Sequence, residues 1–143
     1  MPSYTYNNED NRMDYCPAGV YAGTIKWADD SKLSQHGDQQ LNVRWVMDDN
    51  GAGAFDRLTF SAKAGWRIDV FLKATGNQPK EGKGTPVELT ADMVMGWRAY
   101  LNVGIENDRK VEGKKNNIIL NYVTDKGIPP ALPEAEDDKN KPF

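Results

Sequence analysis

The chain contains the run Leu41-Asn42-Val43-Arg44-Trp45-Val46-Met47, followed at once by Asp48-Asp49-Asn50-Gly51. In the first part, Leu, Val, Trp and Met alternate with a second set of residues, which is the pattern of a strand with one buried face. The Asn-Gly pair tolerates the positive φ angles of a tight hairpin turn. Residues 54–60 are therefore predicted to form the partner strand, with Leu58 and Phe60 toward the core and Phe55, Arg57 and Thr59 facing out.

Further strands and one helix are predicted on both sides of this hairpin. Residues 20–27 are rich in strand formers, with Gly23 as a bulge or bend, and residues 98–105 and 117–123 give two more strands. In 64–75, apolar residues recur at spacings of three and four, which predicts a helix that ends at Gly76. The helix stripe is Ile68, Phe71, Leu72 and Thr75, and a short helical turn is expected over 90–96.

The resulting order is strand, strand, strand, helix, strand, strand. This is the order of the OB-fold, a five-stranded Greek-key β-barrel, so the predicted class is all-β with one helix. We expect an N-terminal arm over residues 1–18, the barrel domain over 19–125 and a disordered acidic tail over 126–143. Trp45, Trp66 and Trp97 are expected in the core.

The charge of the chain is unevenly distributed. The net charge is -3, yet residues 19–127 hold 15 basic and 14 acidic side chains, so the acidic excess lies at the two ends. The most basic stretch, residues 109–115, falls in the loop between the fourth and fifth strands. In OB-folds that loop, the loop between strands 1 and 2 and the strand 2–3 face bind oligonucleotides or sugars. A solvated loop is the alternative interpretation of such a charge run.

A binder of single strands needs cations for phosphates and flat side chains on which bases stack. Alternation places Arg44, Phe55 and Arg57 on one outer face, with Lys26 nearby, and Trp27 ends the first strand at the edge of a loop. For Trp27 and Tyr100, core packing is the competing interpretation. The candidate DNA-binding residues are Lys26, Trp27, Arg44, Phe55, Arg57, Tyr100, Arg109, Lys110, Lys114 and Lys115.

Four short motifs, in their order and spacing, resemble a family of bacteriophage OB-fold proteins that includes single-stranded DNA-binding proteins. They are Pro17-Ala-Gly-Val-Tyr21, Phe55-Asp-Arg-Leu58, Lys73-Ala-Thr-Gly76 and Asn117-Ile-Ile-Leu-Asn-Tyr122. The resemblance implies a protein that coats single-stranded DNA during phage replication or recombination, in the cytoplasm of the infected bacterial host. One cysteine, Cys16, permits no internal disulfide, which agrees with a reducing compartment.

The end of the chain is similar to the tails of bacterial and phage single-stranded DNA-binding proteins. The similarity implies that Asp137, Asp138, Pro142 and Phe143 dock replication or recombination proteins. A tethered run of acids is also expected to compete with DNA for a cationic groove. Lys139 and Lys141 interrupt the acids near the tip, which departs from the pattern, and a solubilising tail is the alternative.

Enzyme and metal motifs are weak, and we predict no enzymatic activity, cofactor or metal. Glu112-Gly113-Lys114 matches half of a nuclease motif but falls in a loop, so a metal-dependent nuclease is the lesser alternative. His36 is the single histidine of the chain, and the sequence offers no set of zinc ligands around it. Gly82-Lys83-Gly84-Thr85 fails the spacing of a phosphate-binding loop. An OB-fold protein-interaction module is the other alternative, and the oligomeric state is left open.

Overall fold

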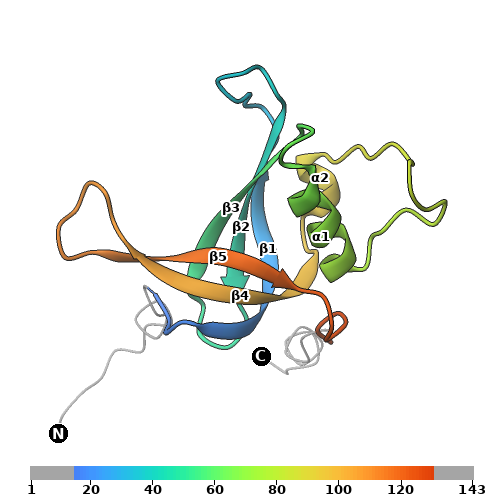
Figure 1. The fold of residues 1–143 in the computed structure, drawn as a ribbon. Coiled ribbons are helices and arrows are strands. Elements are labelled where there is room, and N and C mark those ends of the chain that lie inside the picture. Colours follow the sequence, from blue (N-terminus) through green and yellow to red (C-terminus); the bar gives the residue numbers. More distant parts are fainter. Residues whose placement is uncertain (1–14, 131–143) are drawn as a thin grey trace, which may run out of the picture.

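A computed structural model describes residues 15–130 of the chain, which form a closed five-stranded barrel with one three-turn helix (Figure 1). The elements are β1 (Gly19–Asp29), β2 (Gln40–Met47), β3 (Gly53–Thr59), α1 (Gly65–Thr75), α2 (Ala91–Val94), β4 (Arg98–Asn107) and β5 (Lys115–Val123). The strand order around the barrel is β1-β2-β3-β5-β4. This confirms the predicted fold class, an OB-type barrel, and α2 is the expected short helical turn.

The barrel closes where β3 meets β5. All other strand pairs are antiparallel, whereas β3 and β5 run parallel and pair only at Ala54 with Asn117 and at Phe55 with Ile118. The β1–β2 loop (30–39) and the β4–β5 loop (108–114) project from the barrel in different directions, while α1 and α2 lie together on one side (Figure 1).

The inner faces of the strands form the core with α1. The predicted inward set of β2, Leu41, Val43, Trp45 and Met47, is at most 1% exposed, which confirms the alternation. From α1, Phe71 packs edge to face against Trp45, with ring centroids 6.3 Å apart. Gly76 ends the helix with a left-handed φ of 75°, as expected. The apolar face of α1 thus packs against the barrel core and covers it.

Some core predictions are wrong at particular positions. Trp66 is 59% exposed because it lies two residues before Ile68, about 200° around the helix from the buried stripe. Ile105 continues the alternation of Ala99, Leu101 and Val103 along β4, yet it is 39% exposed, because β1 begins at Gly19, opposite Val103, and only β5 pairs with β4 beyond that point. Trp97 and Phe60 are half-buried against the core.

Two residues outside the expected barrel limits are buried. Cys16, in the segment expected as an arm, is fully buried in the core cluster. Pro129, in the segment expected as a tail, is buried too. The neighbouring Ile128 side chain packs so closely on Gly76 that a Cβ atom added to this glycine would lie 3.2 Å from Cγ1 of Ile128. The packed domain therefore includes residues beyond both ends of the strands.

Candidate functional site

A row of four side chains crosses the outer face of the barrel. Register pairing places Trp27 of β1 beside Arg44 of β2, Arg44 beside Phe55 of β3, and Phe55 beside Ile118 of β5. Side chains of paired residues project to the same side of a sheet. The row therefore brings two aromatic rings, one guanidinium and one aliphatic side chain from four strands onto one surface.

Trp27 and Phe55 meet edge to face across β2. Their ring centroids are 5.9 Å apart at an interplanar angle of 74°, and the two side chains are 46% and 61% exposed. A bulge in β1 explains the position of Trp27, because the register shifts between Ile25 and Trp27 and leaves Lys26 unpaired. Lys26 and Trp27 are both exposed as a result. Large apolar side chains that gather in one exposed patch mark interaction sites in folded proteins.

On one side of the aromatic pair lies a pocket of about 750 Å³, here called the Arg44 pocket. Its residues include Arg44, Lys114, Lys115, Glu106, Tyr15 and Phe55. The Arg44 side chain turns toward Gly53, where a Cβ would be 2.7 Å from Cζ of the guanidinium, so only glycine leaves this space free. Three cations against one carboxylate give the Arg44 pocket an excess of positive charge.

On the other side of the pair lies a pocket of about 470 Å³, here called the Arg57 pocket. It shares Phe55 and Ile118 with the Arg44 pocket, so the two pockets form one groove divided by those two side chains. Arg57 is held in place because its Nε–H donates to Oδ1 of Asn42 at 2.9 Å. The other residues of the Arg57 pocket include Trp27, Asp29, Lys32, Asn42 and Asp56.

Asp29 at the rim of the Arg57 pocket is held as a carboxylate. Hydrogen bonds from the hydroxyl and then the backbone N–H of Ser31, at 2.7 and 3.1 Å, lower the pKa of Asp29 below its ordinary value. This pocket therefore carries two cations, Lys32 and Arg57, and two acids, the half-buried Asp29 and Asp56. The Arg44 pocket is the more cationic part of the groove.

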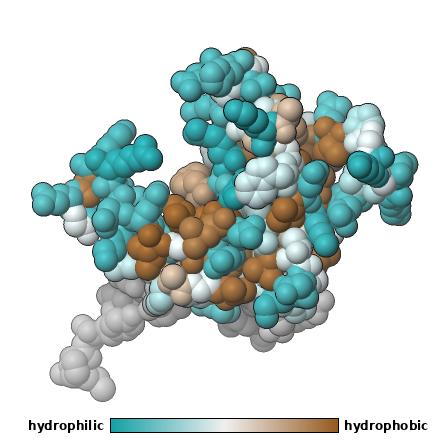
Figure 2. Space-filling model, viewed as in Figure 1, coloured by the Kyte–Doolittle hydropathy of each residue, from teal (hydrophilic) through white to brown (hydrophobic). Residues whose placement is uncertain are grey.

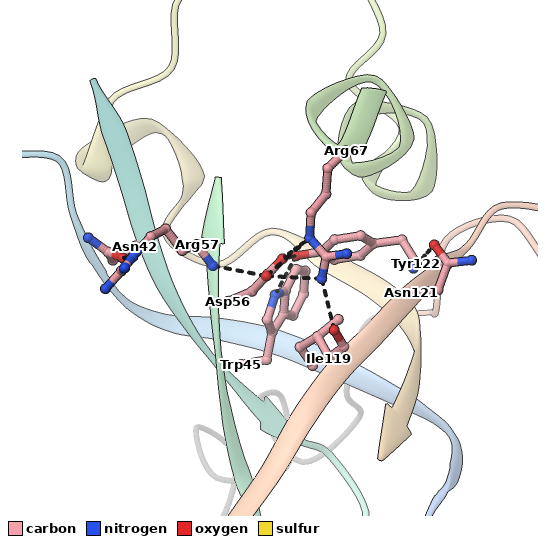
Figure 3. A network of polar contacts seen from close by, with 8 residues as sticks. All are labelled: Asn42, Trp45, Asp56, Arg57, Arg67, Ile119, Asn121 and Tyr122. Carbon is pink, nitrogen blue, oxygen red and sulfur yellow. Dashed lines mark hydrogen bonds and ion pairs between the residues drawn. The ribbon is translucent and has the colours of Figure 1, made fainter. Parts of the chain in front are cut away.

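Asp56 does not present a free carboxylate to the groove, because a network of polar contacts occupies it (Figure 3). Arg67 of α1 donates to Asp56 at 3.0 Å and to the backbone oxygen of Ile119 at 2.8 Å, so this one side chain bridges β3 and β5 where their pairing stops. Tyr122 also donates to Asp56 through a short hydrogen bond, and Trp45 donates to the Tyr122 oxygen at 3.2 Å. Burial, and then the Asp56 charge, raise the pKa of Tyr122 well above its ordinary value. The network stabilises the wall of the Arg57 pocket.

The β4–β5 loop is ordered around Asp108. The Asp108 carboxylate accepts hydrogen bonds from the Asn116 side chain at 3.0 Å and from the backbone N–H groups of Lys110 and Val111 at 2.8 and 2.9 Å. These bonds, that of Asn116 first, lower the pKa of Asp108 to about 2. Lys114 lies 4.0 Å from the same carboxylate. The ordered loop therefore leads into the groove, where Lys114 and Lys115, the first residue of β5, line the Arg44 pocket.

The structure brings six of the ten predicted DNA-binding residues together in the groove: Trp27, Arg44, Phe55, Arg57, Lys114 and Lys115. Arg109 and Lys110 are exposed in the β4–β5 loop, and Lys26 is exposed at the bulge, but none of the three lines either pocket. Tyr100 of β4 is half-buried and pairs with Ala22 and Val123. Ala22 lies five positions before Trp27 on β1, so Tyr100 is about 16 Å from Trp27 along the strand direction. The tail residues Asp137, Asp138, Pro142 and Phe143 lie outside the described residues.

Several residues of the groove were not predicted from the sequence. Asn42 and Ile118 lie on outward positions of strands, where alternation could have found them, whereas Lys32 and Tyr15 lie outside the strands and have no such signal. Gly53 differs again, because its importance depends on the conformation of a neighbouring side chain.

The surface of the barrel combines hydrophobic patches with hydrophilic loops. Figure 2 shows hydrophobic residues gathered across the middle of the barrel in this view, between hydrophilic loops that project outward. Within residues 15–130, no cluster of three His, Cys, Asp or Glu side chains is arranged to hold a metal ion. No helix in that same part of the chain is long and apolar enough to cross a membrane.

No family model and no curated protein matches this chain.

Proposed function

We propose that this protein binds single-stranded DNA along the groove formed by the Arg44 and Arg57 pockets. The observation that carries the proposal is the exposed Trp27–Phe55 pair, with a guanidinium on each side of it. Exposed aromatic rings provide stacking surfaces for unpaired bases, and cations beside them neutralise the phosphates between those bases. A duplex hides the faces of its bases, so the groove favours single strands.

The position of the groove supports the same proposal. It crosses β2 and β3 and is bounded by the β1–β2 and β4–β5 loops, which is the region that OB-folds use for oligonucleotides. The resemblance of the sequence to phage single-stranded DNA-binding proteins extends the proposal to replication or recombination of a phage genome in the host cytoplasm.

A fluorescence titration tests the proposal directly. Oligo(dT) and a duplex of equal length are titrated at several salt concentrations, and the change in tryptophan emission, to which Trp27 in the groove contributes, is the signal. We expect tighter binding of the single strand and a log–log salt slope of about -0.7 for each phosphate neutralised. Equal affinity for duplex at every salt concentration would contradict the proposal. Weak binding that salt does not change would favour a protein-interaction module instead.

The acidic tail is part of this proposed function. We propose that Asp137, Asp138, Pro142 and Phe143 dock replication or recombination proteins, and that the acids of the tail compete with DNA. Because Ile128 packs on Gly76 and Pro129 is buried, a truncation that spares the domain begins at residue 131. Removing residues 131–143 is expected to tighten single-strand binding, most at low salt. Unchanged affinity at low salt would exclude the competition.

A further inference from the structure

Tyr15 is an aromatic residue of the groove that precedes the first strand. It is 41% exposed and lines the Arg44 pocket together with Arg44, Lys114 and Lys115. In that pocket, Phe55 is the other aromatic ring, and it lies at the boundary with the Arg57 pocket. Tyr15 therefore adds a flat surface where the cations of the groove are most concentrated.

The backbone next to Tyr15 is fixed by one buried side chain. The Cys16 N–H donates to Oδ1 of Asn117 at 2.8 Å, and Nδ2 of Asn117 donates to the Cys16 oxygen at 2.9 Å and to the Gly104 oxygen at 3.0 Å. Asn117 is 5% exposed and satisfies its carbonyl and amide groups through these bonds. The Cys16 side chain is fully buried, so the chain is held from both its backbone and its side chain.

A second contact fixes the following residue. The Tyr21 hydroxyl donates to the Pro17 oxygen at 2.7 Å. Residues 16 and 17 are thus tied to β5 and β1, and Tyr15 occupies a defined place at the edge of the barrel. The backbone that follows Tyr15 is already ordered, which lowers the cost of ordering on binding.

The location of Asn117 explains why Tyr15 reaches the groove. Asn117 pairs with Ala54, and the next pair along the two strands is Phe55 with Ile118. Asn117, which anchors Cys16, is therefore adjacent in sequence to Ile118, one of the two side chains that divide the groove. Lys115 precedes it by two residues on the same strand.

We propose that Tyr15 is a second stacking site for a nucleobase, placed at the Arg44-pocket end of the groove by the bonds between Asn117 and Cys16. This inference rests on the proposed function, and it deepens it. A single strand then stacks one base at the Trp27–Phe55 pair and another on Tyr15, with Arg44, Lys114 and Lys115 neutralising the phosphates between them.

The test compares the full-length Tyr15→Ala and Tyr15→Phe variants with wild type in oligo(dT) titrations. The Tyr15→Ala variant is expected to bind about tenfold more weakly, because a base–aromatic stack is removed, and Tyr15→Phe to remain within about twofold of wild type. Because the Tyr15 side chain is uncharged, the salt slope stays unchanged in both variants. Trp66→Ala is the matched control, since Trp66 is an exposed aromatic residue that lines neither pocket.

The outcomes separate this inference from the proposed function. If wild type binds oligo(dT) and Phe55→Ala weakens binding while Tyr15→Ala does not, Tyr15 is only a cover for the barrel edge and the inference is wrong. If Tyr15→Ala and Trp66→Ala weaken binding equally, the effect is not a contact in the groove and the inference is again wrong. If wild type itself prefers no single strand, it is the proposed function that fails. Thermal unfolding of Tyr15→Ala is expected to match wild type, because both Cys16 bonds involve backbone atoms.

Discussion

The guanidinium of Arg44 lies against Gly53 on the neighbouring strand, in space that a side chain at position 53 would occupy. An added Cβ would lie 2.7 Å from Cζ and 2.9 Å from Nε of Arg44, closer than such atoms approach in proteins. These atoms are the far end of a flexible side chain, so a substitution at position 53 would displace the guanidinium and leave the strand in place. Gly53 therefore determines where Arg44 points.

This relationship predicts that Gly53→Ala weakens single-strand binding several-fold without destabilising the barrel. Alanine in a strand is more favourable than glycine by about 0.5–1 kcal/mol, so thermal stability is expected to hold or rise slightly. The measurement is a double-mutant cycle with Arg44→Ala, read by oligo(dT) titration. In the Arg44→Ala background the Gly53 substitution is expected to change little. Additive effects of the two substitutions would show that Gly53 acts independently of Arg44.

Phe55→Ala is expected to cost about 1–3 kcal/mol of binding free energy through removal of a stacking surface for one base. The Phe55 side chain is 61% exposed, so the free energy of unfolding should change by less than about 0.5 kcal/mol. Leu120→Ala serves as the control, because Leu120 is 52% exposed on β5 and lines neither pocket. Lower thermal stability with normal DNA affinity would instead assign Phe55 a packing role.

The two halves of the basic loop should contribute differently. Lys114 and Lys115 line the Arg44 pocket, whereas Arg109 and Lys110 do not, so two double alanine variants remove the same charge from different places. The Lys114/Lys115 variant is expected to flatten the salt slope by about 0.7 for each phosphate that these lysines neutralise in wild type. The Arg109/Lys110 variant should change the slope less. Equal slopes for the two variants would mean that the loop acts through its overall electrostatic field and not through direct phosphate binding.

Asp56→Ala is expected to lower the free energy of unfolding by about 3 kcal/mol, because it leaves a largely buried Arg67 without its carboxylate. Tyr122→Phe removes two hydrogen bonds of the same network, the one to Asp56 and the one from Trp45, and should cost about 1–2 kcal/mol. Chemical denaturation of both variants checks this order. A larger effect of Tyr122→Phe would place the network's main contribution in the Trp45–Tyr122 hydrogen bond.

The barrel could be predicted from the sequence because each strand has one buried face. Alternation identified the inward set of β2, and spacings of three and four identified the buried stripe of α1, since burial imposes those periods directly. The site was less predictable where the period breaks. The bulge at Lys26 turns Trp27 outward, and no local signal in the sequence specifies that shift.

Interactions between distant segments account for the rest of what the sequence did not predict. Asp56 occupies an inward position of β3, and its partner Arg67 comes from the helix that follows. Tyr15 reaches the groove through Asn117, about a hundred residues later in the chain. Tyr100 faces outward as alternation suggests, but closure of the barrel carries it away from the β2–β3 face. Such relationships depend on the closed fold and not on any local pattern.

The order of the β4–β5 loop should depend on the ionisation of Asp108. Its folded pKa of about 2 lies below its ordinary value of 3.8, so the carboxylate favours the folded loop. The contribution to stability is therefore fully present above about pH 4 and disappears as the pH falls through about 2. At neutral pH, Asp108→Ala removes the acceptor for the Lys110 and Val111 N–H groups, and hydrogen exchange of those two amides should become faster. Single-strand affinity is expected to fall modestly because Lys114 and Lys115 become less ordered, although the substitution makes the loop more positive. Faster exchange with tighter DNA binding would show that net charge, and not loop geometry, controls the affinity of this part of the groove.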